Sequence, residues 1–216
     1  MVLVSVFALQ MNAQINAPGK FYVTPKIGYN MANITLFDKY GADPRHGINV
    51  GIAGEYAVNE RISIEPGVFY SMQGSAFKLG SVKLGLHNDY VTVPVLLKAY
   101  VADGFNVFAG PQAGFLINSR LRLNSGIGIL DDIVNVLSSS LNLAKYENTF
   151  DFAIVAGLGY QLPMGLSISA NYNFGLTNVP KINDLKMPWQ KEDEQPYAFD
   201  INAKNTVLQV NIGYRF

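Results

Sequence analysis

The C-terminal stretch NTVLQVNIGYRF, residues 205–216, decides the fold. From Leu208 to Phe216 every second residue is apolar, and the residues between them are polar, small or charged. Alternation with a period of two is typical of a β-strand whose two faces meet different surroundings. The stretch therefore predicts a final strand with one apolar face and one polar face.

The same alternation recurs along the chain and predicts an all-β fold. Further strands are expected at residues 21–31, 48–56, 62–71, 91–99, 105–117, 150–161 and 166–175. Short turns, among them Asp103-Gly104, separate these strands in alternation with long connections that include residues 74–88, 119–148 and 177–204. Outer-membrane barrels combine short periplasmic turns with longer extracellular loops. We therefore predict an eight-stranded antiparallel up-and-down transmembrane β-barrel with short periplasmic turns and long extracellular loops.

A soluble β-sandwich also alternates, so the period alone leaves both folds open. Here the polar face consists mainly of Gly, Ala, Ser, Asn and Gln, which suit a narrow barrel interior. On the apolar face, aromatic residues gather toward both strand ends, as in the two girdles of a membrane barrel. They are Phe21, Tyr56, Phe105, Tyr160 and Phe216 at the turn ends, and Tyr29, Tyr70, Phe115, Phe150 and Phe174 at the loop ends. These features favour the cell outer membrane.

The N-terminus predicts a signal peptide at residues 1–14, followed by a barrel domain at residues 15–216. Residues 2–9 form an apolar run, and small or polar residues follow, with cleavage expected near Ala13 or Gln14. Because no basic residue precedes the run, we expect the true start to lie upstream. A disordered or strand-forming N-terminus is the alternative.

Composition excludes several classes of site. The sequence has no cysteine, which excludes disulfides, thiolate zinc sites and cysteine nucleophiles. Its formal net charge is zero and only 15% of its residues are charged, which gives no footprint for nucleic acid. We therefore expect no nucleic-acid partner.

Four segments resemble the PorT-like outer-membrane β-barrel family. They are GKFYV at residues 19–23, KIGYN at residues 26–30, YVTVPVLLK at residues 90–98 and GYRF at residues 213–216. The resemblance implies a porin-like barrel in outer-membrane lipid, but its motifs specify strands and no chemistry. The secretion role of PorT does not follow without a matching site. Tyr214 and Phe216 also resemble the C-terminal signal that the barrel assembly machinery recognises, which implies that machinery as a partner.

If the apolar face meets lipid, the charged residues of the strands point into the barrel. These residues are Lys26, Glu55, Glu65, Lys98 and Arg215. Opposite charges in a narrow interior must pair or be hydrated, because an unpaired buried charge is costly. We expect a cross-strand pair between Glu65 and Lys98, and we expect Tyr22, Phe69 and Phe108 to fill the lumen.

The function predicted from the sequence is structural or surface-interacting, with binding through residues 119–148 and 177–204. A narrow porin-like channel for small solutes is the alternative. A barrel-embedded enzyme would need a base near the loop side, where His46 and His87 lie, but their spacing matches no catalytic motif. We expect no enzyme, cofactor or metal site. The helical spacing of apolar residues predicts a short helix at residues 130–141.

Overall fold

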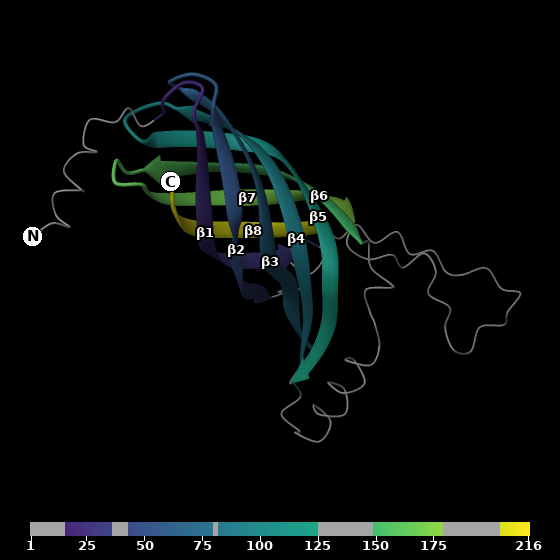
Figure 1. The fold of residues 1–216 in the computed structure, drawn as a ribbon. Coiled ribbons are helices and arrows are strands. Elements are labelled where there is room, and N and C mark those ends of the chain that lie inside the picture. Colours follow the sequence, from purple (N-terminus) through teal and green to yellow (C-terminus); the bar gives the residue numbers. More distant parts are fainter. Residues whose placement is uncertain (1–15, 36–42, 80–81, 125–148, 179–203) are drawn as a thin grey trace, which may run out of the picture.

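The computed structural model describes residues 16–35, 43–79, 82–124, 149–178 and 204–216, with the backbone alone for 77–79, 82–84 and 121–124. Consecutive strands pair antiparallel, and β1 closes the barrel against β8 (Figure 1). The strands are β1 (Phe21–Ile34), β2 (Asp43–Ala57), β3 (Ile62–Leu79), β4 (Val82–Tyr100), β5 (Phe105–Asn124), β6 (Phe150–Gln161), β7 (Leu166–Asn178) and β8 (Lys204–Tyr214). The predicted eight-stranded barrel is confirmed.

Tight turns lie at one end of the barrel, which we name the turn end. They connect β2 to β3, β4 to β5 and β6 to β7. The C-terminus lies at this end, because the Phe216 amide donates to the Val23 carbonyl at 2.9 Å. Gly104 has a φ of +76°, and a Cβ there would lie 2.1 Å from the Gln161 carbonyl oxygen. The turn predicted at Asp103-Gly104 therefore requires glycine. We name the opposite end the loop end.

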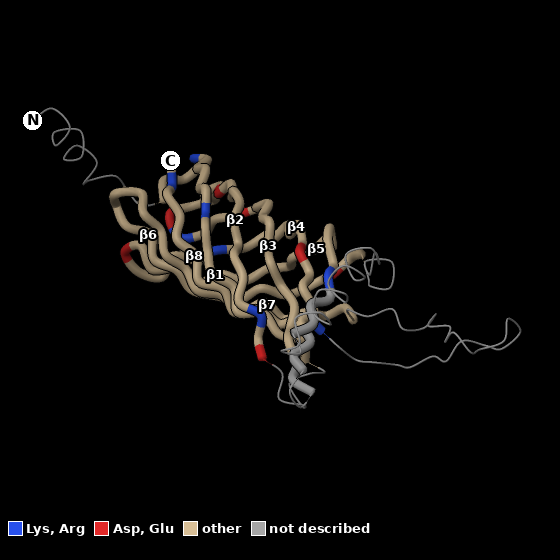
Figure 2. The backbone as a smooth tube through the Cα atoms, turned by 90° about the horizontal axis from the view of Figure 1, so that it is seen from below, with Lys and Arg blue, Asp and Glu red and all other residues tan. Residues whose placement is uncertain are grey.

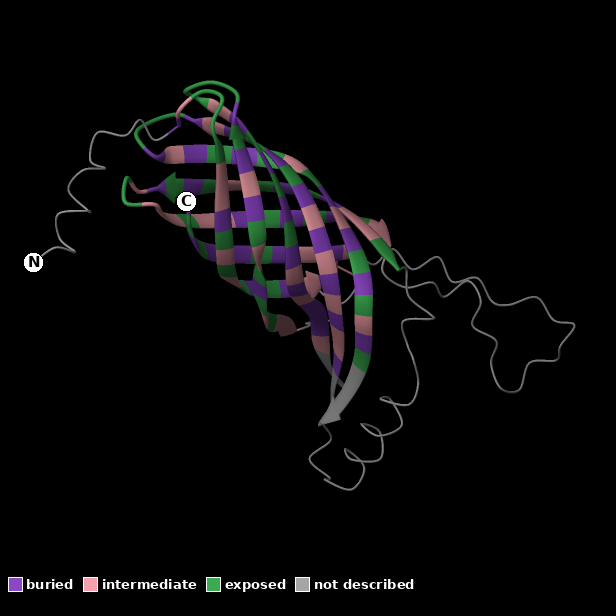
Figure 3. Cartoon of the chain, in the orientation of Figure 1, coloured by how far each residue is buried: buried purple, intermediate pink, exposed green. Residues whose placement is uncertain are grey.

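The two faces of the barrel wall differ in polarity, as Figure 3 shows by the alternation of buried and exposed residues along each strand. Ile27, Ile52 and Ile212 are 60%, 51% and 51% exposed on the outer face. The inner face buries Asn, Ser, Gln and Thr side chains. Large exposed aromatic residues include Phe21, Tyr56, Tyr160, Phe216, Tyr29, Phe115, Phe150 and Phe174. The predicted outward apolar face is confirmed.

Strands β3, β4 and β5 are longer than the rest, at 18, 19 and 20 residues. The other strands have 11 to 15 residues, and a tilted strand needs only about 9 to 11 to cross a bilayer. We name the excess at the loop end the rim extension: residues 74–79 of β3, 82–89 of β4 and 118–124 of β5. Figure 1 shows β5 continuing past the other strands here.

The predicted long loop at residues 74–88 is therefore wrong. Those residues belong to β3 and β4, apart from 80–81, and the two strands pair from Met72↔Asp89 to Leu79↔Val82. Residues 119–124 likewise belong to β5, residues 177–178 to β7, and residue 204 to β8. The alternation continues through Phe77-Lys78-Leu79 and through residues 82–87, so the strands continue with it.

Several predictions fall outside the described residues. These are the signal peptide at residues 1–14, the helix at residues 130–141, and the loop residues 125–148 and 179–203. Within the described part of the chain, no helix is both long enough and apolar enough to cross a membrane.

Candidate functional site

The charged residues of the wall meet inside the barrel near the turn end. Lys26 Nζ lies 2.5 Å from Glu65 Oε1, and Lys98 Nζ lies 3.0 Å from Glu65 Oε2. Lys98 Nζ also lies 2.9 Å from Glu55 Oε2, and Arg215 Nη2 lies 3.8 Å from Glu55 Oε1. The structure thus brings together the five residues predicted to form an interior network. We name this group the charge cluster.

Neutral side chains complete the bonding of the charge cluster. Ser63 Oγ and Tyr100 Oη each donate to Glu55 Oε1 at 2.7 Å. The Arg215 guanidinium lies 3.5 Å from the centre of the Tyr22 ring, a cation–π geometry. Both glutamates are buried, with Glu55 1% and Glu65 3% exposed. A buried carboxylate with several donors is compensated, so the cluster holds five strand ends together.

Sequence reasoning missed some of these partners. Ser63 and Tyr100 occupy inward-facing positions in the alternation of β3 and β4, so the alternation could have identified them. Asn16 precedes β1 and carries no such signal. Its Nδ2 donates to the Asn59 carbonyl at 2.7 Å, and its Oδ1 accepts from Arg215 Nη2 at 3.4 Å. Asn16 therefore covers the charge cluster at the turn end.

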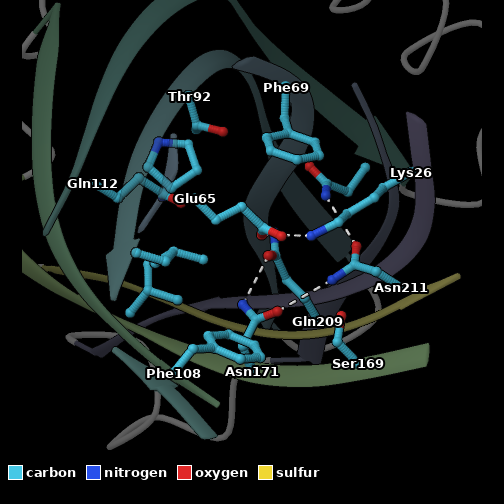
Figure 4. A pocket seen from close by; sticks show the side chains of 14 residues that line it. Lys26, Glu65, Phe69, Thr92, Phe108, Gln112, Ser169, Asn171, Gln209 and Asn211 are labelled. Carbon is cyan, nitrogen blue, oxygen red and sulfur yellow. Dashed lines mark hydrogen bonds and ion pairs between the residues drawn. The ribbon is translucent and has the colours of Figure 1, made fainter. Parts of the chain in front are cut away.

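The middle of the lumen holds an apolar group beside a chain of amides (Figure 4). Leu96, Phe108 and Val155 form a buried hydrophobic cluster. Opposite them, the hydrogen bonds run from Asn49 Nδ2 to Asn211 Oδ1 at 3.0 Å, from Asn211 Nδ2 to Asn171 Oδ1 at 3.1 Å, and from Asn171 Nδ2 to Gln209 Oε1 at 2.9 Å. These links join β2, β7 and β8 across the lumen.

Little space is left between these layers. One cavity of about 40 Å³ lies between Lys26, Glu65 and the amide chain. A second cavity of about 20 Å³ borders the charge cluster. A cavity needs roughly 10 to 15 Å³ to hold one water, so the two spaces hold only a few waters. Among the described residues, therefore, side chains fill most of the lumen around these two cavities.

A second polar layer lies inside the barrel toward the loop end. Asn205 Nδ2 donates to Tyr90 Oη and to Asp151 Oδ2, both at 3.2 Å. Thr177 Oγ1 also donates to Asp151. Tyr90 is only 1% exposed, so its hydroxyl is buried within this layer. This layer ties β4, β6, β7 and β8 together.

The base of the rim extension is tied to the barrel by Arg45. Its Nη1 donates to the Asn88 carbonyl at 3.0 Å and also to the Gln73 carbonyl, and its Nη2 lies 3.1 Å from Asp89 Oδ1. Gly74 lies under this side chain: a Cβ at Gly74 would meet Arg45 Cδ at 3.3 Å and the Leu86 carbonyl oxygen at 2.1 Å. Arg45 thus connects β2 to β3 and β4, and its side chain passes beside Gly74, which leaves room for it.

Charged residues are sparse along the wall, and Figure 2 shows most of the backbone without them. Within the described residues, no group of His, Cys, Asp and Glu is arranged to hold a metal ion. His46 stacks on Tyr29 at a centroid distance of 5.8 Å, and its Nδ1 is hydrogen-bonded to the tyrosine hydroxyl. His87 lies on a different strand, β4, opposite Arg120. The two histidines therefore lie on separate strands, β2 and β4.

A comparison with protein-family models agrees with the barrel architecture. A family model described as "Outer membrane protein beta-barrel domain" matches residues 12–180. No curated protein matches the chain.

Several solved structures are similar to the chain. Ail, the attachment invasion locus protein of Yersinia pestis, is 15% identical with a TM-score of 0.47, and the match covers 91% of this chain and 99% of that one. Neisserial surface protein A is 12% identical with a TM-score of 0.45, covering 91% and 97%. OprG from Pseudomonas aeruginosa is 13% identical with a TM-score of 0.40, covering 94% and 98%.

Proposed function

The chain belongs to the outer membrane protein beta-barrel domain family, and from that premise we propose that it is a surface-interaction protein of the cell outer membrane. We infer that the turn end lies in the periplasm and the loop end outside the cell, since outer-membrane barrels have short periplasmic turns. The protein binds its partner at the extracellular end, through residues 119–148 and 177–204. Within the family we assign it to the PorT-like group, on the resemblance of residues 19–30, 90–98 and 213–216.

The filled lumen is the observation that supports this proposal. A solute path would need a continuous polar space, whereas the cavities beside the amide chain and beside the charge cluster are only about 40 and 20 Å³. Phe69 and Phe108, each 8% exposed, border the cavity beside the amide chain, and the charge cluster lies below it. An eight-stranded barrel is narrow enough for side chains to fill it. Function is then left to the outer surface and the extracellular end.

Planar-bilayer recordings test the proposal against the alternative, a narrow porin-like channel. The purified full chain should produce no stable, ohmic single-channel steps in a preparation where a wide porin, added as a positive control, conducts. Reproducible steps from the wild-type protein would contradict the proposal and make passive solute passage its function. We propose no catalytic role, because the two histidines lie on different strands, β2 and β4, and their spacing in the sequence matches no catalytic motif.

The last residues support a second partner, the barrel assembly machinery. Tyr214 and Phe216 lie on the outer face, 40% and 73% exposed, with their rings 4.8 Å apart in an edge-to-face arrangement. Because both rings are outside the packed interior, Phe216→Ala should lower the amount of barrel assembled in cells while leaving the unfolding of purified, refolded protein nearly unchanged. An unchanged amount of assembled protein would count against this role.

We also propose that residues 1–14 are a signal peptide and that residues 15–216 form the mature barrel. The described chain starts at Asn16, which already contacts the barrel through Asn59 and Arg215. N-terminal sequencing of protein extracted from outer membranes should give a start near residue 14 or 15. A start at Met1 would contradict the proposal.

A further inference from the structure

The last part of β5 has an open backbone edge. On one side, β5 pairs with β4 as far as its last residue, Asn124. On the other side, its pairing with β6 ends at Phe115↔Phe150, and one more hydrogen bond follows, from the Leu116 amide. Within the described chain, no strand pairs with residues 117–124 on this side, and Figure 1 shows this part of β5 turned away from β6. We name the β6 side of residues 117–124 the β5 edge.

The two edges of the rim extension differ. β2 covers the β3 edge, where Asp43 pairs with Ala76 and Pro44 with Ser75. The β5 edge has no such cover among the described residues, and residues 117–124 contain no proline that would block pairing. Every second residue of an edge strand directs its N–H and C=O away from the sheet. These groups extend over roughly 26 Å, so the β5 edge is long enough to pair with a further strand.

Side-chain hydrogen bonds hold the start of the β5 edge in an extended conformation. On the outer face, Asn118 Nδ2 donates to Asp89 Oδ2 at 3.2 Å. On the inner face, Ser119 Oγ donates to Asn88 Oδ1 at 2.9 Å. Both bonds tie β5 to β4. Because the strand is already formed, a partner that pairs with it does not have to order this part of the barrel, which favours binding.

Arg120 gives the β5 edge a positive charge. Its side chain is exposed, and its Nε donates to Asn118 Oδ1 at 3.3 Å. Among the described residues Arg120 makes no ion pair, and Asp89 on the neighbouring strand is paired with Arg45 Nη2 at 3.1 Å. A residue directly opposite Arg120 in an added strand would share its face, with Cβ atoms about 5 Å apart. An acidic residue at that position would form a cross-strand ion pair with Arg120.

A second copy of this chain fits the β5 edge poorly. Barrels in one membrane are inserted in the same direction, so two neighbouring β5 strands would run parallel. An in-register pair would then place Arg120 beside the same residue of the other copy, and like charges on neighbouring strands destabilise a sheet. An acidic segment of a different protein avoids this repulsion.

We propose that the β5 edge binds an extended acidic segment of another protein outside the cell, which adds to the rim extension as a further strand. This inference rests on the proposed function, because it names the class of partner and the place where it binds. In strand addition of this kind, main-chain hydrogen bonds supply the affinity and side chains at alternate positions supply the specificity. Arg120 selects an acidic residue on its own face of the added strand.

The test uses the full chain in neutral detergent micelles and a peptide of alternating Thr and Glu as long as the β5 edge. The wild type should bind this peptide more tightly than a matching peptide of alternating Thr and Lys, and added salt should reduce the difference. The Thr-Glu peptide with methylated backbone nitrogens should not bind, because it has no N–H donors for the edge. Binding should slow amide hydrogen exchange at alternate residues within 117–124. Exchange at residues 105–115 should stay unchanged, because these residues already pair with β4 and β6.

A charge reversal at the edge tests the role of Arg120. Arg120→Glu should weaken binding of the Thr-Glu peptide roughly fivefold and should strengthen binding of the Thr-Lys peptide, because the cross-strand charge pair changes sign. Arg61→Glu is the matched control, since it makes the same change at an exposed arginine near the turn end. It should leave both affinities unchanged. Heat-modified gel mobility verifies that each variant is folded.

Several results would overturn the proposal. They are no binding of the Thr-Glu peptide, equal affinity for the two peptides, and binding that leaves hydrogen exchange at residues 117–124 unchanged. Slow exchange at all of these residues in the protein alone would also overturn it, because this chain would then cover the edge itself. A dimer that the Thr-Glu peptide dissociates, seen by sedimentation, would assign the edge to a second copy instead. Bilayer conductance is a separate readout, so failure of strand addition and failure of the filled-lumen proposal are distinguishable.

Discussion

In the barrel wall, apolar residues of β3, β4 and β5 lie on the outer face, whereas in the rim extension the apolar Leu86 lies on the inner side and the charged Arg120 on the outer side. Ile64, Val68 and Val95 are exposed on the outside of the wall. Farther along the same strands, Leu86 pairs with the buried Ser75, on the side that continues the barrel interior. On the outer side there, Arg120 of β5 is exposed.

The reversal shows where the surroundings of the sheet change. A wall strand meets hydrocarbon outside and polar side chains inside, so its outer residues must be apolar. Beyond the hydrocarbon the outer surroundings are headgroups and water, which favour charged residues. The reversal begins near Gly74, where Arg45 ties β2 to β3 and β4. We infer that the strands leave the membrane there without ending.

The largest expected effect is on the free energy of unfolding, which should fall more when an ion pair is lost inside the wall than at the base of the extension. Glu65→Ala leaves Lys26 and Lys98 without a shared partner, which costs about 3 to 5 kcal/mol if both stay buried. Asp89→Ala removes an ion pair at the base of the extension and should cost less. Urea titrations of refolded protein, followed by far-UV circular dichroism, measure both. Similar costs for the two variants would remove the energetic distinction between the regions.

An introduced charge on the outer face should distinguish the regions in a second way. Ile52, 51% exposed in the wall, lies between the two aromatic girdles. Ile52→Lys should cost about 2 to 4 kcal/mol, because the cation then faces the middle of the bilayer. Ala76→Lys places the same charge on the outer face of the extension and should change the free energy of unfolding little. These values apply to protein refolded in lipid vesicles, and equal losses would place both residues in one environment.

A smaller effect is expected where the extension joins the wall. Gly74→Ala brings a Cβ to 2.1 Å from the Leu86 carbonyl oxygen, at a φ of +133° that other residues rarely adopt. Strain of this kind costs about 1 to 3 kcal/mol. Gly114→Ala is the matched control, because its nearest contact would be 3.4 Å. Hydrogen exchange at residues 74–89 should rise in the first variant only, and exchange like that of the wild type would show that the junction tolerates a side chain.

The sequence was sufficient to predict the barrel because membrane strands alternate strictly. At positions such as Ile27 and Ile212, the polar neighbours in the sequence indicate that the apolar side chain faces outward. The same parity predicted that Glu65 and Lys98 would face inward, where they lie 3.0 Å apart. Period two fixes the direction of each side chain once the strand is recognised.

The rim extension could not be predicted in the same way, because there the apolar Leu86 lies on the inner side of the sheet and the charged Arg120 on the outer side. When apolar residues are expected on the outer face, Gly74, Lys78 and Lys83 are assigned to a loop. Residues 82–87 nevertheless alternate as regularly as the wall. The β-bulge at Ile117, which has no opposite residue in the register with β4, also changes which residues of β5 face outward. Asn16 was missed for another reason: it lies outside any periodic segment, and its contact with Arg215 depends on the closed barrel.

The most direct test of this account measures where the outer face of β5 leaves the bilayer. The chain contains no cysteine, so a single nitroxide label can be attached at Ala109→Cys, in the wall, or at Arg120→Cys, in the extension. Both positions are exposed on the outer face. In lipid vesicles, we predict that the label at position 109 is more accessible to oxygen, and the label at position 120 more accessible to a water-soluble nickel chelate. Greater oxygen accessibility at both positions would contradict the account, because it would place the rim extension inside the hydrocarbon.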